Sequence, residues 1–282
     1  MKQETSEVLI RLLPKKSREK LEKNKIRIFS PQSIDIPRPS GTAEPPKETS
    51  DVTKGIDVEV VQRRALDMPV RMVEGSYETD LAGVVNARMA LEAEKEGFDA
   101  VVIDCYNEPG ATATKEVCTI PVVTSPGASM AVASLLGNKF SIIIALAGAK
   151  GKQAGGVGRT TLMDIVKHYG FESKIASIRA IDLAPPAFNP KLVSRQDFDA
   201  LKKEMLAQAK AAIDEDGAEV IISYAGSEVN EYLKKKLPDV PIVDSHGCTN
   251  IMAEVLVRLG LSHSKKAYPK PREIFKYYLR SE

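Results

Sequence analysis

Runs of apolar residues alternate with segments of helical periodicity along the first half of the chain. The nearly continuous, β-branched runs at 25–30, 57–62, 99–104 and 120–125 predict strands that are buried on both faces of a sheet. Residues 76–97 place apolar side chains at helical spacing, begin at Ser76 with acidic residues in the first turn, and end at Gly97. This alternation predicts an α/β fold with mainly parallel sheets.

The second half of the chain repeats this order. Apolar runs at 139–148, 174–183, 218–223 and 240–245 correspond to the four earlier runs, and residues 194–217 correspond to the long helix. The segments IPVVTSPGAS and VPIVDSHGCT align without a gap, so that Pro121 matches Pro241 and Gly127 matches Gly247. Any two α/β units share some features, but the common order, helix length and turn residues favour a duplication. We therefore predict two pseudo-symmetric αβα domains.

The predicted organisation has three parts. Residues 1–24 form an N-terminal extension with the pattern of a short amphipathic helix. Residues 25–124 together with 244–282 form the first α/β domain, and residues 125–243 form the second. Within the first domain, the segment 31–50 contains five prolines, too many for a normal helix interior.

Composition and charge exclude several classes of protein. The 40 basic and 38 acidic residues are spread along the chain, so no basic field points to nucleic acid or to an anionic membrane. The three cysteines form no CxxC motif and cannot all pair, which favours a reducing cytoplasm. The apolar run near the N-terminus is too short for a signal peptide or a membrane-spanning helix. We expect a cytoplasmic protein whose partner is a small molecule.

Two strand-to-loop junctions carry the candidate chemistry. The segment DAVVIDCYNEPGA (99–111) breaks from strand to loop at Cys105, and AEVIISYAGSEVN (218–230) breaks at Tyr224. In open α/β sheets, ligands bind beyond the carboxyl ends of the strands. Two domains that face each other across a pseudo-twofold axis would direct both residues into one interdomain cleft, where we expect the active site.

These segments resemble the aspartate/glutamate racemase superfamily, and most closely its hydantoin racemase branch. In that branch the first junction reads Cys, aromatic, small or polar, acidic, Pro, Gly, which is Cys105 to Gly110 here. The resemblance covers roughly residues 25–262. It implies an active site between two αβα domains, no metal and no cofactor, and a homo-oligomer that acts on a small carboxylate or hydantoin-like ligand. It also implies that thiols move a proton at the carbon next to a carbonyl.

The second junction departs from that family pattern. The resemblance implies a second cysteine followed by Ala-Gly, whereas this chain has Tyr224 followed by Ala225 and Gly226. A phenol, with a pKa near 10, is a poor substitute for a thiolate, but it can donate a proton or hold an oxyanion. A racemase or isomerase that uses Cys105 is therefore the main prediction. The alternatives are a one-thiol decarboxylase or lyase, a maleate-isomerase-like enzyme, and a binding protein without turnover.

We expect the thiol pKa of Cys105 to be lowered by backbone amides of its loop and of a short helix near 111–117. His246, on the loop VDSHGCTN, is a further candidate base because imidazole titrates near neutrality, although a simple turn residue is the alternative. Cys118 fits a buried structural thiol, and His168 and His263 fit surface positions. The expected substrate contacts lie at strand ends and on the loops beside them: Ser30, Gln32, Ser33, Tyr106, Asn107, Ser125, Ser129, Ala225, Gly226, Asp244, Ser245 and Cys248.

One competing motif is the segment QAGGVGRTT at 153–161. It partly matches the phosphate-binding pattern Gly-x-x-x-x-Gly-Lys-Ser/Thr, but Gln153 stands at the first glycine and Arg159 at the lysine. We assign its glycines at 155, 156 and 158 to a loop that shapes or covers the substrate pocket. A flexible surface loop is the alternative.

Overall fold

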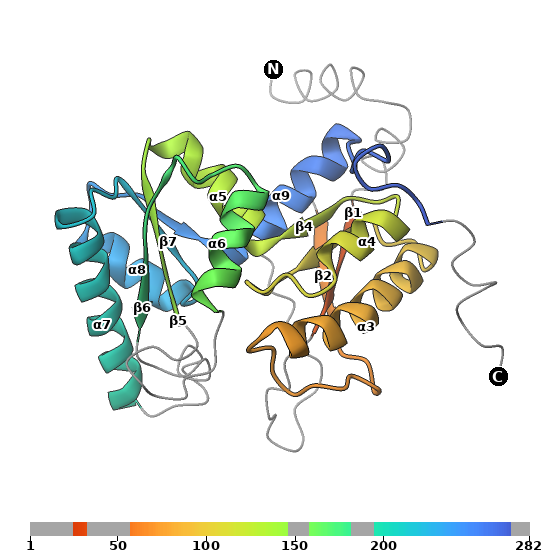
Figure 1. Cartoon of the computed structure of the whole chain (residues 1–282), viewed down its shortest axis with the longest axis horizontal. Coiled ribbons are helices and arrows are strands. Elements are labelled where there is room, and N and C mark those ends of the chain that lie inside the picture. Colours follow the sequence, from red (N-terminus) through yellow and green to blue (C-terminus); the bar gives the residue numbers. More distant parts are fainter. Residues whose placement is uncertain (1–24, 33–56, 146–157, 182–194, 272–282) are drawn as a thin grey trace.

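The computed structural model describes residues 25–32, 57–145, 158–181 and 195–271, and it has two sheets of four parallel strands each (Figure 1). The first sheet has the order β2-β1-β3-β4, from β1 (Lys25–Pro31), β2 (Asp57–Arg63), β3 (Ala100–Ile103) and β4 (Val122–Thr124). The second has the order β6-β5-β7-β8, from β5 (Phe140–Ala145), β6 (Ile175–Ile181), β7 (Val220–Ser223) and β8 (Ile242–Asp244). The predicted α/β class and internal pseudo-symmetry are confirmed.

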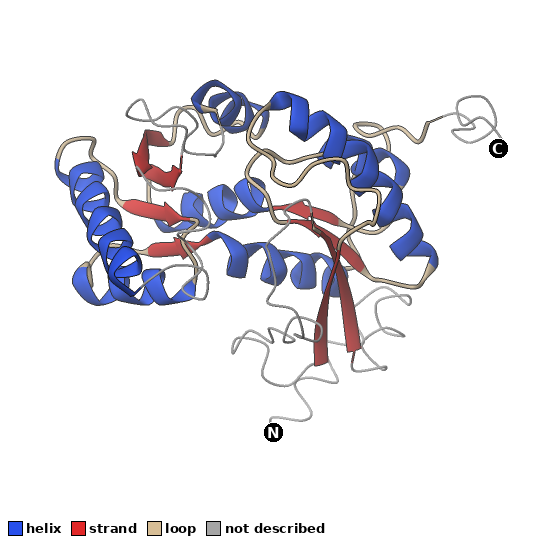
Figure 2. Cartoon of the chain, turned by 90° about the horizontal axis from the view of Figure 1, so that it is seen from below, coloured by secondary structure: helices blue, strands red, loops and turns tan. Residues whose placement is uncertain are grey.

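Register and burial agree between the two sheets. Val101 of β3 pairs with Val122 of β4, and Ile221 of β7 pairs with Ile242 of β8, which are the matching positions of the repeat. All residues of β3 and β7 are buried, because helices pack on both sides of these two strands. Figure 2 shows the helices around the strands. β3 and β7 are therefore central strands, and the loop that follows each of them lies at the carboxyl edge of its own sheet.

Each half carries helices in matching places. The long helices are α3 (Ser76–Lys95) and α7 (Arg195–Asp214), and the short ones after the central strands are α4 (Ala111–Val117) and α8 (Ser227–Lys236). The short helices begin after Gly110 and Gly226, which both have positive φ angles, 76° and 81°. The predicted helices at 76–97 and 194–217 are confirmed to within three residues at each end.

The two helices that follow the last strand of each sheet connect the halves. Helix α5 (Ser125–Leu136) follows β4 but contributes Met130 and Ala133 to the core of the second half. Helix α9 (Ser245–Leu259) follows β8 but contributes Ala253 and Val257 to the core of the first half. The two helices contact each other, and with α6 (Arg159–His168) they lie in the middle of the molecule (Figure 1). We therefore keep boundaries near 124/125 and 243/244 as a proposal.

Some predictions lie outside the described residues. These are the N-terminal extension at 1–24, most of the proline-containing segment, Ser33, and the glycines at 155 and 156. Gly158 is described and is the residue that precedes α6. In the described part of the chain, no helix is both long and apolar enough to span a membrane.

Candidate active site at the junction of the two halves

The loop between β3 and α4 surrounds the sulfur of Cys105 with backbone amides. The amide of Glu108 donates to the Cys105 carbonyl at 3.0 Å, and Glu108 has a left-handed φ of 50°, which is uncommon for a residue other than glycine. This tight turn also directs the amides of Asn107 and Glu108 at the thiol. The predicted helix near 111–117 is confirmed as α4.

The prediction of a lowered pKa for Cys105 is wrong. Burial is the main cause that raises the pKa of its thiol to about 12. The nearby carboxylates of Asp104 and Glu108 raise it as well, and the amides of Asn107 and Glu108 offset only part of the increase. Cys105 is half-buried as a residue. A thiol with this pKa is protonated at neutral pH.

Tyr224 brings the second junction against the first. Its hydroxyl donates to the backbone carbonyl of Asp104 at 2.8 Å, across 120 residues of sequence. Its ring contacts the ring of Tyr106 edge-on, with centroids 4.9 Å apart, and stacks on the His246 ring at 4.3 Å. Burial and the nearby charge of Asp104 raise the pKa of the Tyr224 phenol well above its ordinary value. Its hydroxyl therefore stays protonated and is already used as a donor within the protein.

Asp104, which the sequence analysis did not select, holds His246. Its Oδ2 lies 2.5 Å from Nδ1 of His246, and its Oδ1 accepts from the Ser125 hydroxyl at 2.5 Å. Burial by itself raises the pKa of the Asp104 carboxyl, but the electrostatic interaction and hydrogen bond with His246 and the hydrogen bond from Ser125 lower it overall. Asp104 is therefore an ionised carboxylate at neutral pH. Its only sequence signal is an acidic residue at the end of a buried strand, directly before Cys105.

A buried network of hydroxyl groups supports this carboxylate and the ring of Tyr106. Thr249 donates to the Ser125 oxygen at 3.2 Å. The Tyr106 hydroxyl lies 2.7 Å from that of Ser245 and 3.2 Å from that of Ser129. Ser125, Ser129 and Ser245 have no exposed surface. These contacts hold the walls of the site in place, so substrate contact by Tyr106 and the three serines stays a prediction.

The other expected substrate contacts lie around this junction in different settings. Gln32 donates to the buried Ser30 hydroxyl at 3.3 Å at the end of β1. Asn107 donates to the Val73 carbonyl at 3.2 Å, while its Oδ1 is buried and has no hydrogen-bond partner in the described structure. The remaining residues are Ala225, which is buried, Gly226, which precedes α8, Asp244, which caps the first amides of α9, and Cys248, which packs between the cores of the two halves.

A second polar cluster between the halves was not predicted. Tyr169, at the end of α6, donates to the Glu108 carboxylate at 2.8 Å, and the Thr124 hydroxyl lies 2.8 Å from the Tyr169 oxygen. The ammonium of Lys115 donates to the same phenol at 3.3 Å. Burial raises the pKa of Glu108, although these groups partly offset the effect. The cluster ties the Cys105 loop to the second half.

Two further sequence predictions have clear outcomes. Cys118 is fully buried, as predicted. His263 is not a simple surface residue, because its Nε2 accepts from the Val122 amide at 2.8 Å and burial lowers its pKa to about 4. Across the described residues, no three His, Cys, Asp or Glu side chains gather in a way that could hold a metal ion.

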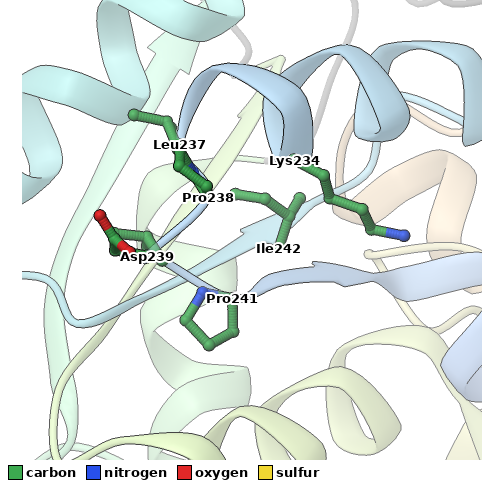
Figure 3. Close-up of a pocket in the computed structure, with 7 residues that line it drawn as sticks. Lys234, Leu237, Pro238, Asp239, Pro241 and Ile242 are labelled. Carbon is green, nitrogen blue, oxygen red and sulfur yellow. The ribbon is translucent and has the colours of Figure 1, made fainter.

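A separate pocket of about 360 Å³ lies between the end of α8 and the start of β8. Figure 3 shows the side chains that line it, among them Lys234, Leu237, Asp239 and Ile242. It opens at the amino end of β8, whereas Cys105 and Tyr224 follow the carboxyl ends of their strands. Because the strands are parallel, these ends lie at opposite edges of the sheet, and the pocket is not part of the site.

Comparisons with known proteins agree with this geometry. The model of the Asp/Glu/hydantoin racemase family matches residues 58–249. The hydantoin racemase of Pseudomonas sp. (strain NS671) is 30% identical over 242 residues, which cover 81% of this chain and 90% of that protein. The allantoin racemase structure from Pseudomonas fluorescens superposes with a TM-score of 0.68 at 26% identity, covering 88% of this chain and 97% of that one. Arylmalonate decarboxylase, at 14% identity and a TM-score of 0.51 over 83% of this chain and 92% of its own, shares the fold alone.

Proposed function

Because the chain belongs to the Asp/Glu/hydantoin racemase family, we propose that it inverts the stereocentre next to a carbonyl in a small hydantoin-like substrate, without a cofactor. Cys105 serves one face of that carbon. Removal of such a proton leaves an enolate, so the reaction needs a well-placed proton carrier on each face. Assembly as a homo-oligomer and a cytoplasmic location stay predictions.

One observation carries the proposal: the segments that follow β3, β7 and β8 meet at Asp104, the residue before Cys105. The Tyr224 hydroxyl reaches the carbonyl of Asp104, the residue before Cys105, and the His246 ring stacks on Tyr224. A thiol, an imidazole and an ionised carboxylate are thus gathered where parallel sheets bind ligands. The raised pKa of Cys105 suits a thiol that delivers its proton to an enolate.

The substrate class rests on the relatives and on one unpaired atom. The buried Oδ1 of Asn107, two residues from Cys105, has no hydrogen-bond partner in the described structure. A buried acceptor without a donor costs about 1–3 kcal/mol, so a substrate N–H that reaches it gains binding energy. A hydantoin ring carries such N–H groups next to its carbonyls. We therefore place hydantoins with a substituent at the stereocentre first, ahead of free amino acids.

A decarboxylase is the second candidate, and the Tyr224 position favours it. A decarboxylase creates its enolate by losing carbon dioxide and needs one proton donor on one face. Cys105 with its pKa near 12 fits that task without a second thiol. The racemase reading ranks higher because the relatives that are 30% identical or more are hydantoin racemases, whereas the decarboxylase shares the fold alone.

The test is an assay of the purified protein, without added cofactor, on single enantiomers of 5-substituted hydantoins and on aryl-substituted malonates. Loss of optical rotation together with uptake of solvent deuterium at the stereocentre supports the racemase proposal. Cys105→Ser is expected to reduce racemisation at least about 100-fold, whereas Cys118→Ser, at a buried thiol away from the junction, keeps it. Release of carbon dioxide from malonates with no change in the hydantoins would overturn the proposal in favour of the decarboxylase.

A further inference from the structure

The loss of a second cysteine raises the question of which group serves the other face of the substrate. Tyr224 occupies that position, but its hydroxyl donates to the Asp104 carbonyl and its pKa is raised. It therefore cannot accept a proton from carbon near neutral pH. Cys248 packs between the two cores, and burial raises its pKa to about 11. Neither residue is a suitable base.

His246 lies where that base is needed. It is in the first turn of α9, its side chain is 37% exposed, and its ring stacks on the Tyr224 ring at 4.3 Å. The ring therefore lies between Tyr224, at the position that the family pattern gives to a thiol, and Asp104 of the first half. The contact with Tyr224 also restricts rotation of the imidazole.

The carboxylate of Asp104 decides which nitrogen of His246 is basic. An ionised carboxylate only accepts hydrogen bonds, so Nδ1, at 2.5 Å from Oδ2, carries the proton. The lone pair of the neutral ring is then on Nε2. The other carboxylate oxygen accepts from the fully buried Ser125, which leaves Asp104 little freedom to turn away from the ring.

Building on the proposed function, we infer that His246 is the proton carrier for the substrate face opposite Cys105, and that Asp104 is the residue that positions it. For one enantiomer, Nε2 takes the proton and the electrons of the broken C–H bond enter the enolate. The thiol of Cys105 gives its proton to the other face of the same carbon. This leaves a thiolate and an imidazolium, and the imidazolium is paired with Asp104. The opposite enantiomer binds to this thiolate–imidazolium form and runs the same steps in reverse, which restores the thiol and the neutral ring, so no other reactant is consumed.

Two unlike groups can replace a pair of thiols here because the net charge of the pair stays the same. A neutral thiol next to a neutral imidazole carries no net charge, and the product pair, thiolate and imidazolium, carries none either. The carboxylate of Asp104 stabilises the imidazolium half of that pair. In the described part of the chain, the charged and titratable groups around His246 include Asp104 from the β3 end, Tyr224 from the β7 end and Asp244 at the start of α9.

The experiment follows α-proton exchange of each hydantoin enantiomer separately in deuterated water, by proton NMR and chiral chromatography. Cys105→Ser is expected to stop inversion yet still exchange one enantiomer, because His246 removes and returns a proton on its own face. His246→Gln is expected to lower racemisation at least about 100-fold and to exchange only the other enantiomer, at alkaline pH where Cys105 ionises. His168→Gln, at an exposed histidine on α6, is the matched control and keeps wild-type rates.

A test of Asp104 needs a measurement that stays unchanged if Asp104 only supports the fold. Asp104→Asn removes the charge that stabilises the imidazolium, so the acid limb of the pH–rate profile moves to lower pH and kcat falls more than KM rises. Asp104→Glu restores part of the rate, whereas Asp67→Asn, at a surface carboxylate bound to Arg88, changes neither property.

The two proposals fail in different ways. If the wild-type protein neither racemises nor exchanges any hydantoin, the proposed function is wrong. If the wild type racemises and folded His246→Gln does so at the same rate, or if folded Cys105→Ser exchanges neither enantiomer, the role of His246 is wrong while the family reaction stands.

Discussion

The reactivity of the Cys105 thiol directly tests how burial and charge act on the site. Burial and the carboxylates of Asp104 and Glu108 raise its pKa from 9.0 to about 12. At neutral pH this difference reduces the thiolate fraction about 1000-fold relative to an ordinary thiol. A thiolate of higher pKa is more nucleophilic, with a Brønsted coefficient of about 0.45. The ionised form of Cys105 therefore reacts about 20-fold faster than an ordinary thiolate. We therefore expect Cys105 to react with a small disulfide reagent about 50-fold more slowly than an ordinary thiol at pH 7.

The assay uses a Cys118→Ser/Cys248→Ser background, so that Cys105 is the single thiol, and measures the reaction rate between pH 6 and pH 10. The rate should rise about tenfold per pH unit across the whole range. Limited access to the half-buried residue lowers all rates equally, so the shape of the profile is the readout. In Asp104→Asn the rate should be higher at each pH, because one of the charges that raise the thiol pKa is gone. A profile that levels off below pH 9 would refute this account of the thiol.

The remaining predictions concern the Cys105 loop. Gly110→Ala should cost about 3 kcal/mol of unfolding free energy in urea titrations, because the new Cβ overlaps the backbone of Gly83 and φ is positive. Gly97→Ala, with a similar φ and open space around it, should cost only about 1 kcal/mol, and equal losses would show that the contact is not tight. Glu108 has a raised pKa, so it lowers stability as pH rises above 4.5. Glu108→Gln should remove that fall between pH 4 and pH 7, and an unchanged slope would exclude a buried carboxylate here.

Much of the fold could be predicted from local sequence. The runs AVVI and VIIS are short, apolar and β-branched, so they form strands wherever helices cover both faces of a sheet. Gly110 and Gly226 mark helix starts because their φ angles suit glycine. The 120-residue offset between Pro121 and Pro241 predicts the repeat of the register. Each of these features is visible in a short segment or in the match between two short segments, so one sequence is enough to predict them.

The sequence by itself also determined that the two junctions differ, with a thiol at Cys105 and a phenol at Tyr224. Only the tertiary structure decided how they work together. The carboxylate of Asp104 meets the imidazole of His246 across 142 residues, and the Tyr224 hydroxyl reaches the Asp104 carbonyl across 120. Asp104 contacts His246 because distant elements pack together, and no local sequence pattern predicts that contact. The raised pKa of the Cys105 thiol has the same origin, because burial and nearby charge outweigh the amides of its own loop.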